Sequence, residues 1–87
     1  MSEQDILRDK VTELFSGMGA DVAMDLRATP SGLLADVYLR IDNSSLVRLY
    51  LPRGGVNVYR VPSFVAGLAD MDRLYADPRR RARLTLV

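Results

Sequence analysis

The sequence predicts a single α+β domain over residues 1–87, in which an N-terminal helix, a four-stranded antiparallel meander, a second helix and a C-terminal strand follow one another, with both helices packed on one face of the sheet. Apolar residues recur at helical spacing over 6–18 and 64–75, and they alternate with period two between 21 and 59. Clusters of Gly, Pro, Asn and Ser separate these stretches. A chain of 87 residues, 48% of them hydrophobic, has room for one modest core and for no second domain.

The first helix is predicted from a capping pair and an apolar stripe. Asp5 stands three residues after Ser2, which resembles a capping box in which Asp replaces the usual Glu. The apolar positions then follow the helical repeat until the sequence "GMG" ends it. These positions are Ile6, Leu7, Val11, Leu14, Phe15 and Met18.

The meander is predicted from alternation and from turn residues. The first strand begins at Asp21, and "TPSG" places Pro and Gly where a type I turn favours them. Further strands are expected over 33–41, 46–51 and 56–59, separated by "DNSS" and "PRGG". Side-chain parity then gives a register, because apolar sides must coincide across each hairpin. In the first hairpin the expected pairs are Ala28 with Leu33 and Val22 with Leu39.

The second and third hairpins decide which polar side chains lie together. A three-residue loop in the second hairpin pairs Tyr38 with Tyr50 and Arg40 with Arg48, whereas a two-residue loop would bury Arg48 without a partner. In the third hairpin Arg48 is expected opposite Tyr59. Arg60 falls on the apolar side of the sheet in this register, so we expect the fourth strand to end or bend there.

The second helix is predicted to open at Pro62 and Ser63 and to end at "DP", after which 81–87 alternates as a terminal strand. The apolar positions of this helix are Phe64, Leu68, Met71 and Leu74 or Tyr75. The predicted core places four strand residues beneath both helices. The strand residues are Val37, Leu39, Leu49 and Val58, and the helix residues are Leu7, Val11, Leu14, Leu68 and Met71.

Several classes of function are excluded by composition. The chain contains no histidine and no cysteine, which rules out imidazole-based triads, thiolate nucleophiles and metal sites built on either residue. Asp70 and Asp72 stand two apart on the predicted helix, about 200° around its axis, and cannot share a metal ion from one face. There is no Gly-rich phosphate loop. We therefore expect neither enzymatic activity nor a cofactor or metal.

A cytoplasmic location is the expectation from the sequence. No apolar run approaches the roughly 20 residues that span a bilayer, and the start "MSEQDILRDK" is too charged for a signal peptide. We expect no membrane association.

The predicted sheet face opposite the helices is rich in tyrosine and arginine. It collects Tyr38, Arg40, Arg48, Tyr50, Asn57 and Tyr59. One interpretation is a solvated surface, on which Asp21 and Asp36 balance the charge and tyrosine stems cover the strands. The other is an interface, since Tyr and Arg are enriched in binding hot spots and also form stacking platforms for single-stranded nucleic acid.

The C-terminal residues carry segregated charge. Residues 1–72 hold seven basic and ten acidic side chains, net −3, whereas residues 73–87 hold five and one, net +4. In a strand, Arg79, Arg81 and Arg83 project from one side, where they either protect a strand edge, contact a protein or bind phosphate. The net charge of the whole chain is only +1, which disfavours the nucleic-acid interpretation.

The sequence therefore predicts a small non-enzymatic binding protein that acts through protein contacts, with a protein partner, a second copy of itself, or both. Self-association is expected because a domain this small has no disulfide to support its core. The alternative is a nucleic-acid-binding module that uses the C-terminal arginines and the Tyr/Arg face.

Overall fold

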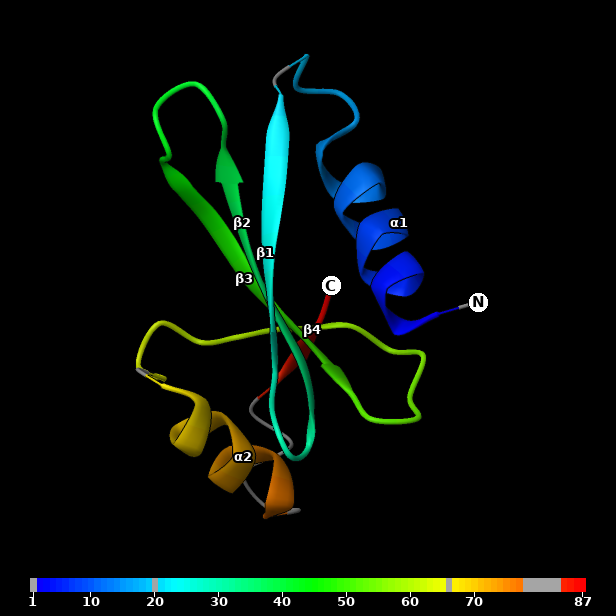
Figure 1. Cartoon of the computed structure of the whole chain (residues 1–87), viewed down its shortest axis with the longest axis vertical. Helices are drawn as coiled ribbons and strands as arrows, with labels where there is room; N and C mark the ends of the chain where they lie inside the picture. Colours follow the sequence, from blue (N-terminus) through cyan, green and yellow to red (C-terminus); the bar gives the residue numbers. More distant parts are fainter. Residues whose placement is uncertain (1, 20, 66, 78–83) are drawn as a thin grey trace.

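The computed structural model describes residues 2–19, 21–65, 67–77 and 84–87. Its elements are α1 (Glu3–Phe15), β1 (Val22–Ala28), β2 (Gly32–Leu39), β3 (Ser45–Pro52), β4 (Tyr59–Arg60), α2 (Leu68–Ala76) and β5 (Thr85–Leu86) (Figure 1). The strands form one antiparallel sheet in the order β1-β2-β3-β4-β5. The predicted α+β class and order of elements are confirmed, and the C-terminal strand extends the meander beside β4.

Helix α1 begins with the predicted capping pair. The Ser2 hydroxyl accepts a hydrogen bond from the Asp5 amide at 3.2 Å, and the Asp5 carboxylate accepts one from the Ser2 amide at 3.4 Å. These hydrogen bonds lower the pKa of Asp5 because they favour its charged form. Leu7 and Val11 form the buried stripe of the helix, while Leu14 is exposed.

The register of the first hairpin is as predicted. Ala28 lies opposite Leu33 and Val22 opposite Leu39. The turn closes where the Thr29 and Gly32 backbones exchange hydrogen bonds of 2.8 and 3.3 Å. Parity allows only pairings that keep the apolar side chains on a common face, and the tight turn fixes which of them forms.

The register of the second hairpin differs from the prediction by four residues. Tyr50 lies opposite Leu34 rather than Tyr38, and Arg48 lies opposite Asp36 rather than Arg40. The loop is longer than expected, with Asn43 in the left-handed region at φ 60°, and the register shifts again between Val37 and Tyr38. The observed register replaces two opposed arginines by an Asp–Arg pair, which is electrostatically favourable.

The third hairpin slips by two residues. Tyr59 lies opposite Tyr50 rather than Arg48, so the buried Val58 takes the place expected for Val56, which is 74% exposed. Strand β4 contains two residues and ends at Arg60, as predicted. A slip by an even number of residues keeps each side chain on its predicted face. The strands could therefore be predicted, although the residues that pair across them could not.

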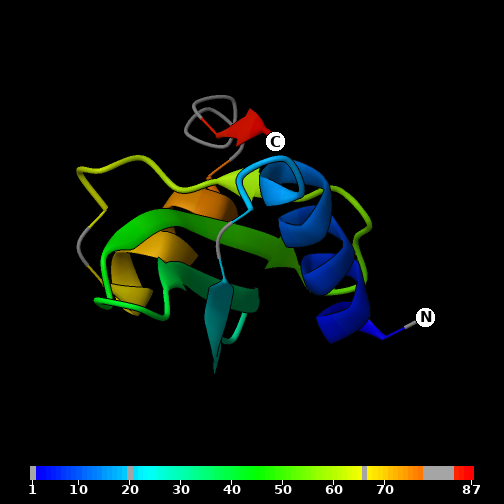
Figure 2. The same ribbon diagram turned by 90° about the horizontal axis from the view of Figure 1, so that it is seen from above.

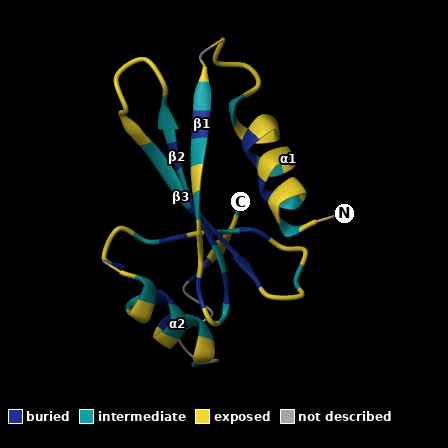
Figure 3. Cartoon of the chain, in the orientation of Figure 1, coloured by how far each residue is buried: buried dark blue, intermediate teal, exposed yellow. Residues whose placement is uncertain are grey.

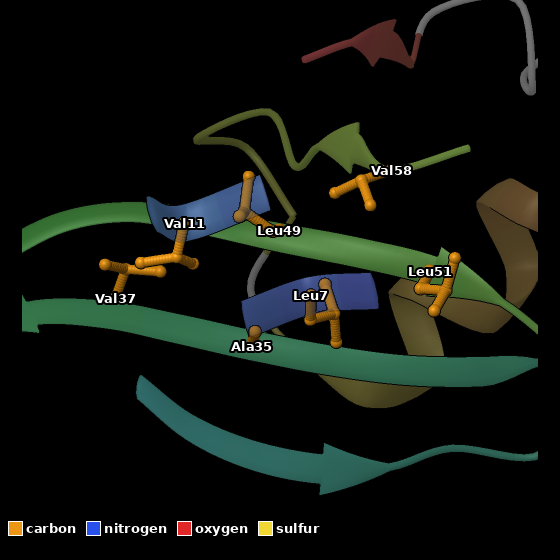
Figure 4. Close-up of a cluster of buried hydrophobic side chains, with 7 residues drawn as sticks. All are labelled: Leu7, Val11, Ala35, Val37, Leu49, Leu51 and Val58. Atoms are coloured by element: carbon orange, nitrogen blue, oxygen red, sulfur yellow. The ribbon is translucent and has the colours of Figure 1, made fainter. Parts of the chain in front are cut away.

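Two apolar clusters lie on opposite faces of the sheet, and the prediction that both helices share one face is wrong. The first cluster joins α1 to β2, β3 and Val58 (Figure 4). Its buried members are Leu7, Val11, Ala35, Val37, Leu49, Leu51 and Val58. The second cluster joins α2 to the other face. Its buried members are Leu34, Tyr50, Val61, Val65, Met71, Leu74 and Leu84.

The predicted core is confirmed in part. Val37, Leu49 and Val58 are buried beneath α1, but Leu39 is only half-buried. Leu68 and Met71 belong to the second cluster, because residues 34 and 50 make the opposite face apolar where α2 covers it. Figure 3 shows the resulting pattern: each helix has a buried side toward the sheet and an exposed outer side.

Candidate functional site: a groove beside strand β3

A groove of about 680 Å³ opens along the β4-facing edge of β3. One wall is the start of β3 from Ser45 to Arg48, and the other consists of residues 60–63 with Val65. Asp36 and Thr85 complete the lining. In Figure 1 the two walls diverge, because the chain that leaves β4 turns away from the first half of β3.

The groove exists because β4 is too short to pair with the whole of β3. After the Tyr50–Tyr59 and Leu49–Arg60 pairs, one further backbone bond remains, from the Val61 amide to the Arg48 carbonyl at 2.8 Å. Within the described ranges, no backbone hydrogen bond joins Ser45–Val47 to the segment after β4. The beginning of β3 therefore presents an open strand edge, which is a template for another extended chain.

Arg48 is fixed in the wall of the groove. Its Nε donates to Asp36 Oδ1 at 2.6 Å, and one of its terminal nitrogens donates to the Val65 carbonyl at 3.4 Å. The two side chains are 31% and 25% exposed, so their pairing is screened less than that of a surface pair. The second oxygen of Asp36 lies 3.7 Å from an Arg27 nitrogen. Both oxygens of the only acidic residue in the lining thus face guanidinium groups.

Arg60 gives the groove its unneutralised positive charge. It is exposed at the end of β4, and no acidic group within ion-pair distance of it occurs among the residues that the structure describes. The lining therefore holds two arginines against one aspartate, together with the hydroxyls of Ser45, Ser63 and Thr85. This combination suits a ligand that offers backbone hydrogen-bonding groups and a carboxylate.

The predicted Tyr/Arg face is divided by the structure. Arg48 lies in the groove, whereas Arg40 is exposed and forms an ion pair with Asp21 at 3.2 Å, as expected from the sequence. Tyr38 and Tyr59 are half-buried in β2 and β4. The predicted cross-strand Tyr38–Tyr50 and Arg40–Arg48 pairs do not form, because the register of the second hairpin is shifted by four residues.

Tyr50 is fully buried, and the prediction that it belongs to an exposed binding face is wrong. Its ring meets that of Tyr75 edge-on at 5.6 Å. Its hydroxyl shares a hydrogen bond with the Ser31 hydroxyl, which also donates to the Asp72 carboxylate. Burial raises the pKa of the Tyr50 phenol. Tyr50 thus joins the first turn to α2 and presents no ring for stacking.

The arginines Arg79, Arg81 and Arg83 lie outside the described residues, and their ladder stays a prediction. The strand that follows them is confirmed at Thr85–Leu86, where it pairs with β4. Sequence reasoning did not assign Arg60, Ser63 and Thr85 to a site. Arg60 could have indicated this site, because its charge falls on the apolar side of the predicted sheet. By itself, that charge predicted only that the fourth strand ends there.

Within the described part of the chain, no group of three acidic side chains could hold a metal ion. None of the helices described is both long enough and apolar enough to cross a membrane. Comparisons with models of protein families, with curated proteins and with solved structures found no match for this chain.

Proposed function

We propose that the chain is a small non-enzymatic protein-binding module that holds an extended, acidic segment of a partner protein in the groove beside β3. The observation that carries this proposal is the open edge at Ser45–Val47, bordered by the ion-paired Arg48 and by Arg60, which has no ion pair among the described residues. Among the described residues that line the groove, two arginines face one aspartate.

The proposed mode of binding is addition of a strand. An extended segment beside β3 would exchange main-chain hydrogen bonds with the open edge, which supplies affinity with little dependence on sequence. Specificity would come from Arg60, whose guanidinium can bind a carboxylate in a bidentate manner. Arg48 is already oriented by Asp36 and the Val65 carbonyl, so it loses little side-chain freedom on binding.

Peptide binding tests the proposal directly. The probe is a dye-labelled synthetic peptide that alternates valine with glutamate, and the comparison peptide carries lysine in place of glutamate. We expect the acidic peptide to bind and to shift the amide NMR signals of residues 45–48 and 60–65. Equal binding of both peptides, or shifts confined to other residues, would contradict the proposal.

Two matched arginine substitutions separate the groove from the general surface charge. Arg60→Glu should weaken binding of the acidic peptide by about tenfold or more, because it reverses the unneutralised charge of the groove. Arg53→Glu makes the same change of charge in the β3–β4 loop, outside the groove lining, and should leave the affinity nearly unchanged. Equal losses in the two variants would indicate non-specific attraction.

The nucleic-acid alternative and a cytoplasmic location remain predictions from the sequence. Burial of Tyr50 removes one of the rings that were expected to stack on bases, and the arginines of residues 79–83 lie outside the described part of the chain. Purification of binding partners from a lysate with and without nuclease tests the alternative. Loss of all partners after nuclease treatment would favour it.

A further inference from the structure

Strand β1 forms a long and regular border of the sheet. The sheet ends on β1 and β5, and β5 contains only two residues. Strand β1 contains seven residues, pairs with β2 in one continuous register and has no proline within its bounds. Figure 2 shows β1 at the lower rim of the molecule. Proteins commonly blunt such an edge with a bulge, a proline or a very short strand, and β1 has none of these features.

The hydrogen-bonding groups on the outer side of β1 can be identified from the pairing with β2. Thr29 exchanges backbone bonds with Gly32, and the Asp21 carbonyl accepts from the Arg40 amide at 3.0 Å. Since antiparallel pairs alternate, the odd-numbered residues direct their amides and carbonyls toward β2. The even-numbered residues Val22, Met24, Leu26 and Ala28 therefore direct theirs outward.

One charge of β1 has no partner among the described residues of the chain. Asp25 lies directly opposite Asp36, and this like-charge pair is unfavourable. Asp36 is compensated by Arg48 at 2.6 Å and by Arg27 at 3.7 Å. Asp25 is exposed and has no ion pair to any residue that the structure describes. A cation from outside the described residues would compensate Asp25.

We infer that β1 is the site of self-association, and that it pairs antiparallel with β1 of a second copy about a two-fold axis at Leu26. In this register Asp25 of each copy lies opposite Arg27 of the other, which forms two symmetric cross-strand charge pairs. Leu26 meets its own equivalent, and Met24 meets Ala28. These apolar contacts, one between the two leucines and two between Met24 and Ala28, lie on the α1 face, so they extend the first apolar cluster.

Other two-fold registers fit less well. An axis at Asp25 would oppose the two aspartates, which is unfavourable. With the axis at Leu26, Val22 lies opposite Pro30, which has no amide, so pairing is confined to the length of β1. Arg27 can serve both Asp36 and the second copy, because its side chain is 58% exposed and a guanidinium has five N–H donors.

Charge reversal with recombination tests this register on the full chain. Sedimentation equilibrium of the unmodified protein should show a dimer at micromolar concentration. Asp25→Arg opposes two arginines in each pair, and Arg27→Asp opposes two aspartates, so each variant alone should dimerise about tenfold more weakly or worse. An equimolar mixture of the two variants should restore the dimer, because each strand then meets its complement. The exposed Arg53→Asp serves as the matched control and should dimerise like the unmodified protein.

Two further results decide the inference. Ala28→Pro removes an outward amide at an exposed position without touching a bond to β2, and it should weaken the dimer while circular dichroism shows an unchanged fold. A strictly monomeric unmodified protein, or a mixture of the two charge variants that stays monomeric while each is folded, would overturn the inference. A dimer that survives Asp25→Arg unchanged would also overturn the proposed register.

Discussion

Arg48 and Asp36 face each other across β3 and β2, with Nε and Oδ1 2.6 Å apart. Since both side chains are mostly buried, removing one leaves the other partly desolvated and unpaired. We expect Asp36→Ala to lower the free energy of unfolding by about 1–3 kcal/mol in urea denaturation. Asp21→Ala, which breaks the exposed pair with Arg40, should cost no more than about 1 kcal/mol. Equal costs would show that the Arg48–Asp36 pair has no special role.

The Ser31 hydroxyl connects Tyr50 to Asp72 and so ties the first turn to α2. Ser31→Ala removes the hydrogen bonds of the hydroxyl to Tyr50, Asp72 and Thr29 and should destabilise the protein by about 1–3 kcal/mol. Hydrogen exchange should show that α2 opens more readily, because residue 31 would then hold Asp72 only through its backbone amide, at 3.2 Å. Asp70→Ala, on the exposed side of the same helix, is the control and should change exchange little.

Burial of Tyr50 predicts a loss of stability in alkaline solution. The pKa of its phenol is raised above about 10 in the folded protein, so at high pH the folded state binds more protons than the unfolded chain. The free energy of unfolding should therefore fall as the pH rises through and above about 10, and the contribution is complete below that value. Urea titrations across this range measure the slope. Tyr50→Phe should flatten it, whereas Tyr38→Phe should retain it because Tyr50 is still present.

The first hairpin could be predicted from the sequence and the second could not, for a physical reason. "TPSG" fixes one loop length, but "DNSS" tolerates several, and slips of two or four residues leave every apolar side chain on the same face. The choice among them depends on the Asp36–Arg48 pair and on the irregularity after Val37, which are tertiary features. The groove depends on the same choice, because it sets where β4 stops pairing with β3.

The alternation of apolar and polar residues in β3 did not predict that Tyr50 is buried. In "LVRLYL" Val47, Leu49 and Leu51 indicate an inward face and the tyrosine an outward one, yet β3 is buried on both faces from Leu49 to Pro52. Tyr50 is buried rather than exposed because α2 adds a second apolar layer on its side of the sheet. The alternating pattern of one strand records which side chains share a face, but it does not record what covers that face.

Gly32 is required by a close approach between strands. A methyl group added at this position would clash with the Leu51 carbonyl oxygen and would lie only 2.8 Å from the Tyr50 hydroxyl oxygen. The backbone oxygen cannot move without disturbing the sheet, so Gly32→Ala should lower the free energy of unfolding by about 1–3 kcal/mol or more. Gly17→Ala, where nothing lies within 4 Å of the added methyl, should be nearly neutral in the same measurement.

Substitution of Leu49 tests how much the first apolar cluster contributes to the free energy of unfolding. It is fully buried between α1 and the sheet, so Leu49→Ala removes packed methyl groups and leaves a cavity, at a cost of about 2–5 kcal/mol. Leu39→Ala, at a half-buried position near the end of β2, should cost clearly less, and Ile41→Ala, at a position 90% exposed, should cost almost nothing. Urea denaturation of the three variants gives the ranking. If Leu39→Ala proved as costly as Leu49→Ala, the result would contradict the observed register, in which Leu49 lies opposite Ala35. It would favour the register predicted from the sequence, which pairs Leu39 with Leu49 and would bury both side chains equally.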